Sequence, residues 1–440
     1  MPLRYYLALL SFFFYVIRHT NRHAGHLIES GHRRLWTSAS PGVDAVQLQY
    51  VKLLKLFIQT VGGWPAKMLH EKENPIFTYH RYHAPIQSIV ITLLEVYYIY
   101  KYQNSSDFFV KAHCYIVTML SVLTTVRTSL PLFKRYNEIV RYFLKEFHLI
   151  HYIVFLLSMI VNGESLFNLA PLYLNYASNV FKDNKYGNVT KIEMSVYWAL
   201  PGLPPLDHLY FYAIYNIFLC YNCAASICSI DLLLSLMLFQ IIGHILLLTR
   251  NLEEIPRPKK LETLTFNDDK GTPCQVTVAM YDREENEMVH KKLVESIQYH
   301  RFIVKFTSDL SNFFGLMLAF NYAFHLVSGC LLLLVMSTGD ISQLSRFGPV
   351  SVVSFGQLIQ ISITFEVINT STKLIDTVYH LPWECMDTRN RRTTQFLLSR
   401  VQSPIQVTAM GMMPVGVTTM AGILKTTFSY FTFLSSMELS

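Results

Sequence analysis

The sequence predicts an all-α membrane protein with seven transmembrane helices, and three observations support this fold class. The 440 residues are 51% hydrophobic and only 15% charged, whereas soluble domains carry about 25% charged residues. Apolar blocks recur along the chain, and each is long enough to cross a hydrocarbon core, which needs roughly 20 helical residues. Phe and Tyr occur 30 and 27 times, and both suit a membrane interior and its interfaces.

Seven apolar blocks follow one another along the chain. Several exceed the length that a hydrocarbon core of about 30 Å requires, and the fourth block contains a single acid, Asp231, between Leu209 and Thr249. We expect these long helices to continue into the cytosol, where their apolar surface packs against other helices or subunits. The blocks span 83–103, 109–133, 149–176, 207–250, 303–338, 347–372 and 401–437.

Charge in the connecting segments predicts the orientation. The segment 1–81 holds ten Lys and Arg against four Asp and Glu, and the connections 134–148, 251–300 and 373–400 are also rich in basic residues. The alternate loops hold fewer basic residues, so the N-terminus is predicted to be intracellular and the C-terminus extracellular. The net charge of +7 then indicates a positive cytoplasmic surface rather than a nucleic-acid partner.

The predicted external loops carry glycosylation signals and no cysteine. Asn104 begins Asn-Ser-Ser and Asn188 begins Asn-Val-Thr, and both acceptors lie in loops that the charge distribution places outside. Because no cysteine lies in these loops, we expect no disulfide framework. Cys220 and Cys223 form a single CxxC on an apolar helix, a pattern more typical of packing than of a metal site.

The first 45 residues form an extension ahead of a predicted cytoplasmic segment, 46–82. Residues 3–17 are apolar apart from Arg4, which is typical of a signal-peptide core and is too short for a span. A cleaved signal would place the mature N-terminus outside and reverse the orientation. The loop charges instead favour an interfacial extension.

Charged residues within the apolar blocks are costly in a membrane and are often functional. Arg127, Asp231 and Glu366 fall near the inner surface, so we expect solvated helix ends, with Arg127 reaching toward water. Glu95 and Glu164 lie deeper, at 1.5 Å per helical residue. Either could face a binding cavity or pair with a neighbour, and the sequence favours neither reading.

The last apolar block has one ionisable residue, Lys425, and a stripe of hydroxyl side chains from Thr426 to Thr432. Such a stripe suits a helix that lines a water-filled pore, and it equally suits close helix packing. Pro404 disfavours helical geometry at the preceding residue, so the sequence predicts a cytosolic helix over 386–402 and a membrane helix over 405–436. Pro414, with glycines on either side, allows a second bend.

Short motifs distributed over about 45–440 carry a family resemblance. They are Gly62-Gly63-Trp64-Pro65, Tyr212-Ala213-Ile214-Tyr215-Asn216, Leu381-Pro382-Trp383-Glu384-Cys385-Met386-Asp387, Ser403-Pro404-Ile405 and Phe428-Ser429-Tyr430-Phe431. A chain with these motifs resembles insect odorant receptors, and more narrowly the sex-pheromone receptor branch of moths. The motif from Leu381 to Asp387 is the most specific of them.

The resemblance implies a multi-pass protein in the plasma membrane of olfactory sensory dendrites. It implies a subunit of a heterotetrameric, ligand-gated, non-selective cation channel that needs an odorant co-receptor. It also implies spans one to six within 83–372, a cytosolic anchor segment at 373–404 and a pore-lining last helix within 405–440. By offset along that helix, the implied pore and gate residues are Lys425, Ser429, Phe433 and Met437.

The resemblance further implies an odorant pocket in the outer half of the subunit. A pheromone is a long apolar chain with a small polar head, and burial of each CH₂ contributes roughly 0.8 kcal/mol. Cavity shape would then select chain length, while a few polar groups would bind the head. Ordinary core packing is the commoner role for any single residue of this kind, and the candidate wall residues are Tyr115, Met119, Glu164, Phe167, Phe211, Tyr215, Phe324 and Phe355.

Other classes of protein fit less well. A G-protein-coupled receptor predicts an external N-terminus and an Asn-Pro-x-x-Tyr motif, which this chain lacks. A gustatory-type receptor shares the predicted orientation, and the Leu381 to Asp387 motif favours the odorant side. A membrane enzyme or transporter is disfavoured by the lack of a catalytic, cofactor or metal motif and of internal inverted repeats.

Overall fold

The computed structural model describes most of the chain between Lys55 and Glu438. Apart from a few residues between 55 and 72, the described ranges are 74–102, 108–144, 171–180, 192–258, 261–267, 273–337, 341–369 and 372–438. All of them belong to one compact unit, Gln49–Ser440. The predicted N-terminal extension, most of the predicted third span and both glycosylation acceptors lie outside the described residues.

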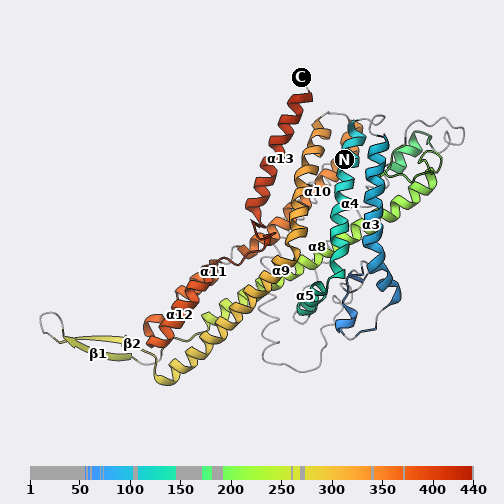
Figure 1. Cartoon of the computed structure of the whole chain (residues 1–440). Coiled ribbons are helices and arrows are strands. Elements are labelled where there is room, and N and C mark those ends of the chain that lie inside the picture. Colours follow the sequence, from blue (N-terminus) through green and yellow to red (C-terminus); the bar gives the residue numbers. More distant parts are fainter. Residues whose placement is uncertain are drawn as a thin grey trace. The chain divides into compact units, whose positions relative to one another are not determined.

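Long helices dominate the described residues (Figure 1). The long ones are α3 (Pro75–Tyr102), α4 (Phe108–Ser129), α8 (Leu209–Glu253), α9 (Arg283–Ser337), α10 (Ile341–Asn369) and α13 (Val417–Glu438). The shorter helices are η2 (Ala66–Leu69), η3 (Leu130–Leu132), α5 (Lys134–Leu144), α11 (Thr372–Tyr379), η5 (Trp383–Cys385) and α12 (Thr388–Val401). The strands form two antiparallel hairpins, β1 (Leu261–Asn267) with β2 (Pro273–Ala279) and β3 (Thr408–Ala409) with β4 (Met413–Pro414).

Three segments in the described ranges are long and apolar enough to cross a membrane by length and composition, namely Val110–Leu132, Leu209–Glu253 and Arg283–Val335. The chain is therefore a helical membrane protein, and the count of seven spans stays a prediction. With 45 and 55 residues, α8 and α9 are about 67 and 82 Å long at 1.5 Å per residue. Both exceed a hydrocarbon core of about 30 Å, as expected from the overlong apolar blocks.

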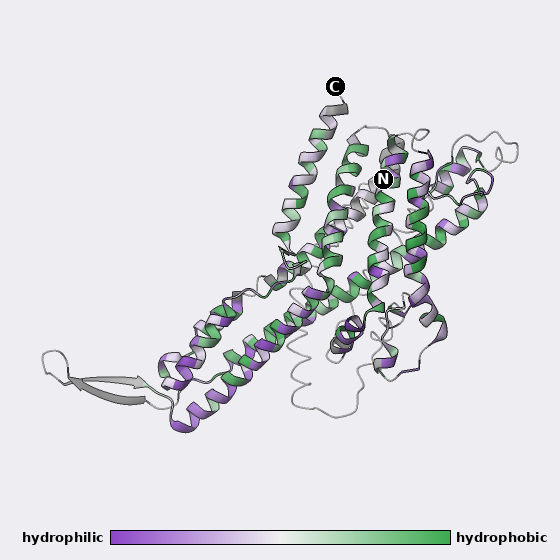
Figure 2. Ribbon diagram, in the orientation of Figure 1, coloured by the Kyte–Doolittle hydropathy of each residue, from purple (hydrophilic) through white to green (hydrophobic). Residues whose placement is uncertain are grey.

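Helix α9 is the central element of the unit, because it contacts α4, α8, α10, α12 and α13. Its composition changes along its length: polar residues gather toward its N-terminal end and apolar residues toward its C-terminal end (Figure 2). Of the charged connection predicted at 251–300, residues 283–300 are thus the first part of the same helix, and 261–267 and 273–279 form the β1–β2 hairpin. Helices α11 and α12 pack on α8 and α9 respectively.

The Gly-Gly-Trp-Pro motif fastens the segment before α3 to the bundle. Arg81 donates hydrogen bonds from Nε to the Gly62 carbonyl at 2.6 Å and from Nη2 to the Trp64 carbonyl at 2.7 Å. Gly62 has a φ of 69°, and a Cβ there would lie 2.5 Å from the Arg81 Cα. The indole of Trp64 donates to Glu71 at 2.8 Å. Only glycine fits this close approach with this backbone conformation.

The Leu381 to Asp387 motif closes the far end of the helical unit through backbone contacts. The Tyr281 amide donates to the Cys385 carbonyl at 3.0 Å, and Asp387 caps α12 by accepting from the Asn390 amide at 2.8 Å. Burial raises the pKa of Tyr281 to about 12, so its hydroxyl stays protonated and donates to the Pro256 carbonyl. We call this region, from Tyr281 to His290 with 381–390, the anchor.

The connection between α12 and α13 differs from the sequence prediction. The helix does break at Pro404, since α12 ends at Val401, but α13 begins only at Val417 rather than at 405. The intervening residues form the β3–β4 hairpin, whose tip places Met410 and Gly411 at φ of 53° and 70°. Two prolines without amide donors and a glycine at positive φ favour this tight hairpin over helix. The predicted second bend is therefore a hairpin.

Candidate functional site

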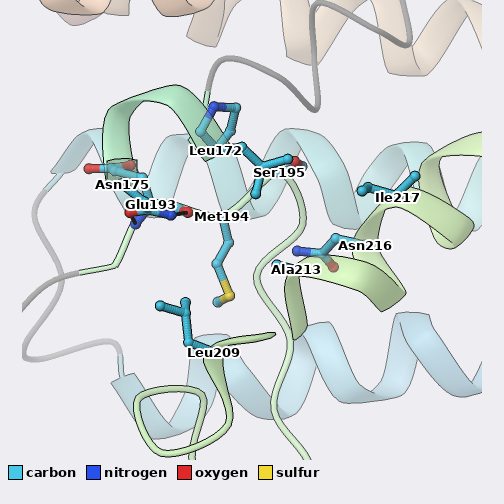
Figure 3. Close-up of a pocket in the computed structure, with 10 residues that line it drawn as sticks. Leu172, Asn175, Glu193, Met194, Ser195, Leu209, Ala213, Asn216 and Ile217 are labelled. Atoms are coloured by element: carbon cyan, nitrogen blue, oxygen red, sulfur yellow. Dashed lines mark hydrogen bonds between the residues drawn. The ribbon is translucent and has the colours of Figure 1, made fainter. Parts of the chain in front are cut away.

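A small pocket with both polar and apolar lining residues lies beside the start of α8 (Figure 3). Asn175 and Glu193 line one side, and Asn216 and Ile217 of α8 line the other. Asn175 holds the backbone of Glu193 with two hydrogen bonds of 2.7 and 3.0 Å. The space is about 20 Å³, which is room for one or two water molecules and is too small for an odorant in this conformation.

The segment that covers this pocket is held to α8 by side chains that the sequence analysis did not select. Buried Trp198 donates from its indole to Asn216 Oδ1 at 2.8 Å, and Asn216 Nδ2 donates to the Val196 carbonyl at 3.1 Å. The Tyr212 hydroxyl donates to the Leu203 carbonyl and accepts from the Leu200 amide. The Tyr212 to Asn216 motif was the available signal, because it contains both polar side chains.

Two of the predicted wall residues lie together on α8. The rings of Phe211 and Tyr215 stack with centroids 5.9 Å apart, and Trp198 contacts both. Tyr215 packs on a buried cluster that joins α3, α4 and α8, whereas Phe211 is 45% exposed. Tyr115 of α4 is 49% exposed.

A second group of predicted wall residues lies between α4, α9 and α10. Met119 packs against a buried cluster that contains Phe324, and Phe355 lies against Gly329 of α9. His113 joins this group to the first, because its ring contacts Tyr197 of one cluster and Phe347 of the other. His113 also bonds the Ser195 carbonyl at 2.8 Å. The remaining predicted wall residues, Glu164 and Phe167, lie outside the described residues.

Glu95 pairs with a neighbouring helix. Its side chain is buried, with 1% exposed, and Oε1 accepts a hydrogen bond of 2.9 Å from the Ser121 hydroxyl of α4. This contact joins α3 to α4 at depth. Oε2 has no hydrogen-bond partner, so one carboxylate oxygen remains available within the bundle. Of the two readings left open by the sequence, pairing with a neighbour is the one the geometry supports.

The expectation that Arg127 and Asp231 are solvated helix ends was wrong. The Arg127 side chain is 0% exposed and that of Asp231 is 7% exposed, and Nη2 lies 3.0 Å from Oδ1. Residues from α4, α8, α9 and α10 surround the pair. Both residues were predicted to be exposed because they lie near the expected ends of their spans. The neighbouring helices α8 and α9 are much longer than a span, however, so they continue past this level and bury the pair. Glu366 is half-buried, and its carboxylate accepts from the Val417 amide at 2.9 Å.

One side of α13 packs on the bundle and the other side is exposed. Thr427 is buried against α9, where Cys330 Sγ lies 3.5 Å from the Thr427 carbonyl. Lys425 and Ser429 are exposed, and Phe433 is 59% exposed. Met437 lies in the last turn of the same helix. Within a single subunit, Lys425, Ser429 and Phe433 therefore face away from α9 and α10.

The described residues contain no group of three or more His, Cys, Asp or Glu side chains that could hold a metal ion. The candidate site offers apolar and aromatic surface with hydroxyl, amide and carboxylate groups. Such surfaces suit reversible binding of small molecules and the passage of ions.

Comparison with known proteins gives a consistent result. The family model described as 7tm odorant receptor matches residues 134–428. Odorant receptor 42a of Drosophila melanogaster is 26% identical over 175 residues, which cover 36% of this chain and 40% of that receptor. The chain thus aligns with less than half the length of this relative.

Solved structures share the fold. The insect olfactory receptor OR5 from Machilis hrabei superposes with a TM-score of 0.64 at 13% identity, covering 89% of this chain and 99% of that one. The same receptor in complex with eugenol gives a TM-score of 0.62 at 12% identity, covering 90% and 100%. At these identities the likeness concerns the fold alone.

Proposed function

The chain belongs to the 7tm odorant receptor family, and from this premise we propose that it is an odorant-binding subunit of a ligand-gated, non-selective cation channel. It is a membrane receptor of olfaction and not an enzyme. We place it in the plasma membrane of olfactory neurons, in a heterotetramer with an odorant co-receptor. Its N-terminus would be intracellular and its C-terminus extracellular.

The observation that carries the channel proposal is the exposed side of α13. Lys425, Ser429 and Phe433 are exposed on one side of this helix. In a membrane protein, such a side needs a partner surface or water against it. Hydroxyl groups and one ammonium group are costly against lipid but are stable beside a water-filled pore. Four such helices around one axis would form that pore, with Phe433 and Met437 as its apolar constriction.

We propose that the ligand is a long-chain apolar volatile, as in sex pheromones. The two groups of wall residues support this. Phe211 and Tyr215 offer aromatic surface from α8, and Met119, Phe324 and Phe355 offer apolar surface between α4, α9 and α10. His113 is a polar group whose ring contacts both clusters, and it could bond an acetate, aldehyde or alcohol head. Gating follows if the ligand binds the open form more tightly.

The test is electrical recording from cells that express this chain with an odorant co-receptor. A panel of long-chain acetates, aldehydes and alcohols should evoke an inward cation current that persists when G-protein signalling is blocked. Phe324→Ala should raise the effective concentration of the best ligand without changing ion selectivity. Phe433→Ala should change permeation or ligand-free current with a smaller effect on ligand sensitivity. Silence of the complex toward the whole panel, or loss of current with the G-protein block, would contradict the proposal.

Orientation and modification have separate tests. An epitope after Ser440 should be stained in intact cells, and an epitope before Gln49 only after permeabilisation. Asn104→Gln and Asn188→Gln should each remove one glycan-dependent shift in gel mobility. The opposite staining pattern would reverse the proposed orientation.

A further inference from the structure

A buried polar network joins four helices at the level where α4 ends. Arg127 Nη1 donates to Asp231 Oδ2 and to the Ile227 carbonyl, both at 3.0 Å, and Nη2 donates to Asn321 Oδ1 at 3.0 Å. Gln357 Nε2 donates to the same Asp231 Oδ2 at 2.7 Å. These residues come from α4, α8, α9 and α10 in turn. We call Arg127, Asp231, Asn321 and Gln357 the polar node.

The polar node holds its helices in register because it is both buried and charged. Charges removed from water are retained only when each is paired and hydrogen-bonded, and removal of one partner leaves an uncompensated buried charge. The guanidinium of Arg127 has a planar fork that fixes the directions of its bonds. A shift of α10 relative to α8 would therefore stretch the bond from Gln357 to Asp231.

Helix α10 connects the polar node to the first turn of α13, because it contains both Gln357 and Glu366. Glu366 lies nine residues beyond Gln357 on α10, about 13 Å along the axis. Its carboxylate accepts from the Val417 amide at 2.9 Å, and a carboxylate at a helix N-terminus satisfies an otherwise unpaired amide and the helix dipole. The node and the start of α13 are thus joined through one continuous helix.

Helix α9 makes a second, parallel connection. Asn321 belongs to the node, and its neighbour Tyr322 directs a buried hydroxyl toward Ser362 of α10 and the backbone of Gly416. This contact joins α9 to α10 and to Gly416, the residue directly before α13. The start of α13 is therefore held by Glu366 on one side and approached by Tyr322 on the other.

We propose that the polar node and Glu366 act as one positioning device that sets the position of the first turn of α13, and through it the equilibrium between closed and open channel. This inference rests on the proposed channel function. The residues of the device are distinct from the candidate wall residues and from the predicted pore residues. They act through α10, which meets both the node and the pore helix.

The test is a double-mutant cycle between Gln357→Leu and Glu366→Gln, recorded in the complex with the co-receptor. Gln357→Leu cuts the tie between the node and α10 without leaving a charge unpaired, and Glu366→Gln weakens the cap of α13. Each single variant should shift the ligand-free open-to-closed ratio by about 2- to 30-fold, the range of coupling networks, and both should shift it in the same direction. The combined shift should fall short of the product of the two by more than about twofold, since independent sites combine within that factor.

Controls separate positioning from folding. Gly356→Ala lies next to Gln357 on α10 and meets no atom within 4 Å, so it should leave the ratio unchanged. Surface labelling of an external epitope measures assembly. If Gln357→Leu fails to assemble, Arg127→Met combined with Asp231→Leu replaces the charged pair by apolar groups and enters the same cycle with Glu366→Gln.

The outcomes distinguish this inference from the proposed function. Shifts that multiply independently, or variants that assemble and gate like the wild type, would overturn the positioning device while leaving the channel intact. A wild-type complex that assembles without any ligand-gated current would overturn the channel proposal itself, and this inference with it. Coupled shifts in one direction would support both.

Discussion

The two halves of α9 are held in contrasting ways. In the anchor, Asn286 and His290 bond the buried Asn390 of α12, and each donor there meets an acceptor. Toward its other end, α9 meets the β3–β4 hairpin and α13 across small residues. Three buried side-chain atoms on this half lack hydrogen-bond partners, namely Asn321 Nδ2, His325 Nε2 and Ser328 Oγ, against one, His300 Nε2, on the half nearer the anchor.

This difference in hydrogen bonding separates contacts that fix the structure of the subunit from contacts that permit movement. Fully paired buried polar groups specify one arrangement and are costly to break. Unpaired ones leave the arrangement less favoured than it could be, so a neighbouring arrangement can lie close in free energy. The anchor half of α9 should therefore govern stability, and the α13 half should govern gating. Three substitutions and one labelling experiment test this division.

The largest expected effect is on stability, from Asn390→Ala in the anchor. Asn390 is 0% exposed, and its amide donates to the Asn286 carbonyl at 2.8 Å. Its removal leaves His290 without its 3.0 Å partner, and an unsatisfied buried polar group costs about 1–3 kcal/mol. Thermal denaturation of the purified complex should show a lower midpoint, and surface expression should fall. Arg392→Ala, at an exposed position, is the control. Equal stability of the two variants would contradict the proposal that the anchor half of α9 governs stability.

The next effect is on gating, from Gly315→Ala where α9 meets the hairpin. A Cβ there would lie 2.9 Å from the Met410 amide nitrogen and 3.1 Å from the Thr408 carbonyl oxygen. Both are backbone atoms, so the hairpin must shift, at a cost of about 1–3 kcal/mol for overpacking. We expect a change of about tenfold or more in ligand sensitivity, measured by dose–response recording.

The matched control for this substitution is Gly243→Ala in α8. A Cβ at Gly243 meets no atom within 4 Å, and alanine favours a helix by about 0.5–1 kcal/mol over glycine. Gly243→Ala should therefore keep wild-type gating and lose no stability. Loss of assembly without altered gating in Gly315→Ala would show that the hairpin contact belongs with the anchor rather than with the moving half.

A smaller gating effect is expected from Gly329→Ala, deeper along α9. Its Cβ would lie 3.0 Å from the Thr427 methyl of α13 and 3.4 Å from the Phe355 ring. These are side-chain atoms that can adjust in part, so a shift of a few-fold in ligand-free current is expected. Thr427→Ser removes the methyl and should restore the wild-type current in the double variant. Failure of this rescue would mean that the effect does not arise at the α9–α13 contact.

The sequence predicted the parts of this division that depend on hydrophobic length and on proline. The overlong apolar blocks indicated helices that extend beyond a membrane, and Pro404 indicated where the terminal helix breaks. The β3–β4 hairpin was not predicted, because its docking depends on Ser311 and Gly315 of a distant helix.

The sequence predicted the types of residue in the candidate site better than it predicted which of them lie together. Met119 and Phe324 do share one buried cluster, whereas Phe211 and Tyr215 form another group with Trp198. Trp198 was missed because its partner Asn216 lies across a turn that no local pattern shows. Burial of Arg127 was missed because sequence depth along one helix does not reveal how far its neighbours extend.

The smallest expected effect concerns Cys385, which reports on the anchor without disturbing it. Its thiol is 7% exposed, and burial, with a contribution from the Glu384 charge, raises the pKa of Cys385 above its usual value. A thiol reacts as the thiolate, so maleimide labelling of Cys385 near pH 7.5 should be slow in the wild type and should rise only at clearly higher pH. The rate should increase in Asn390→Ala and stay unchanged in Gly329→Ala, with Cys385→Ser giving the background from other cysteines. Equal acceleration by both variants would mean that the two halves of α9 open together, and the division between a fixed and a moving half would not hold.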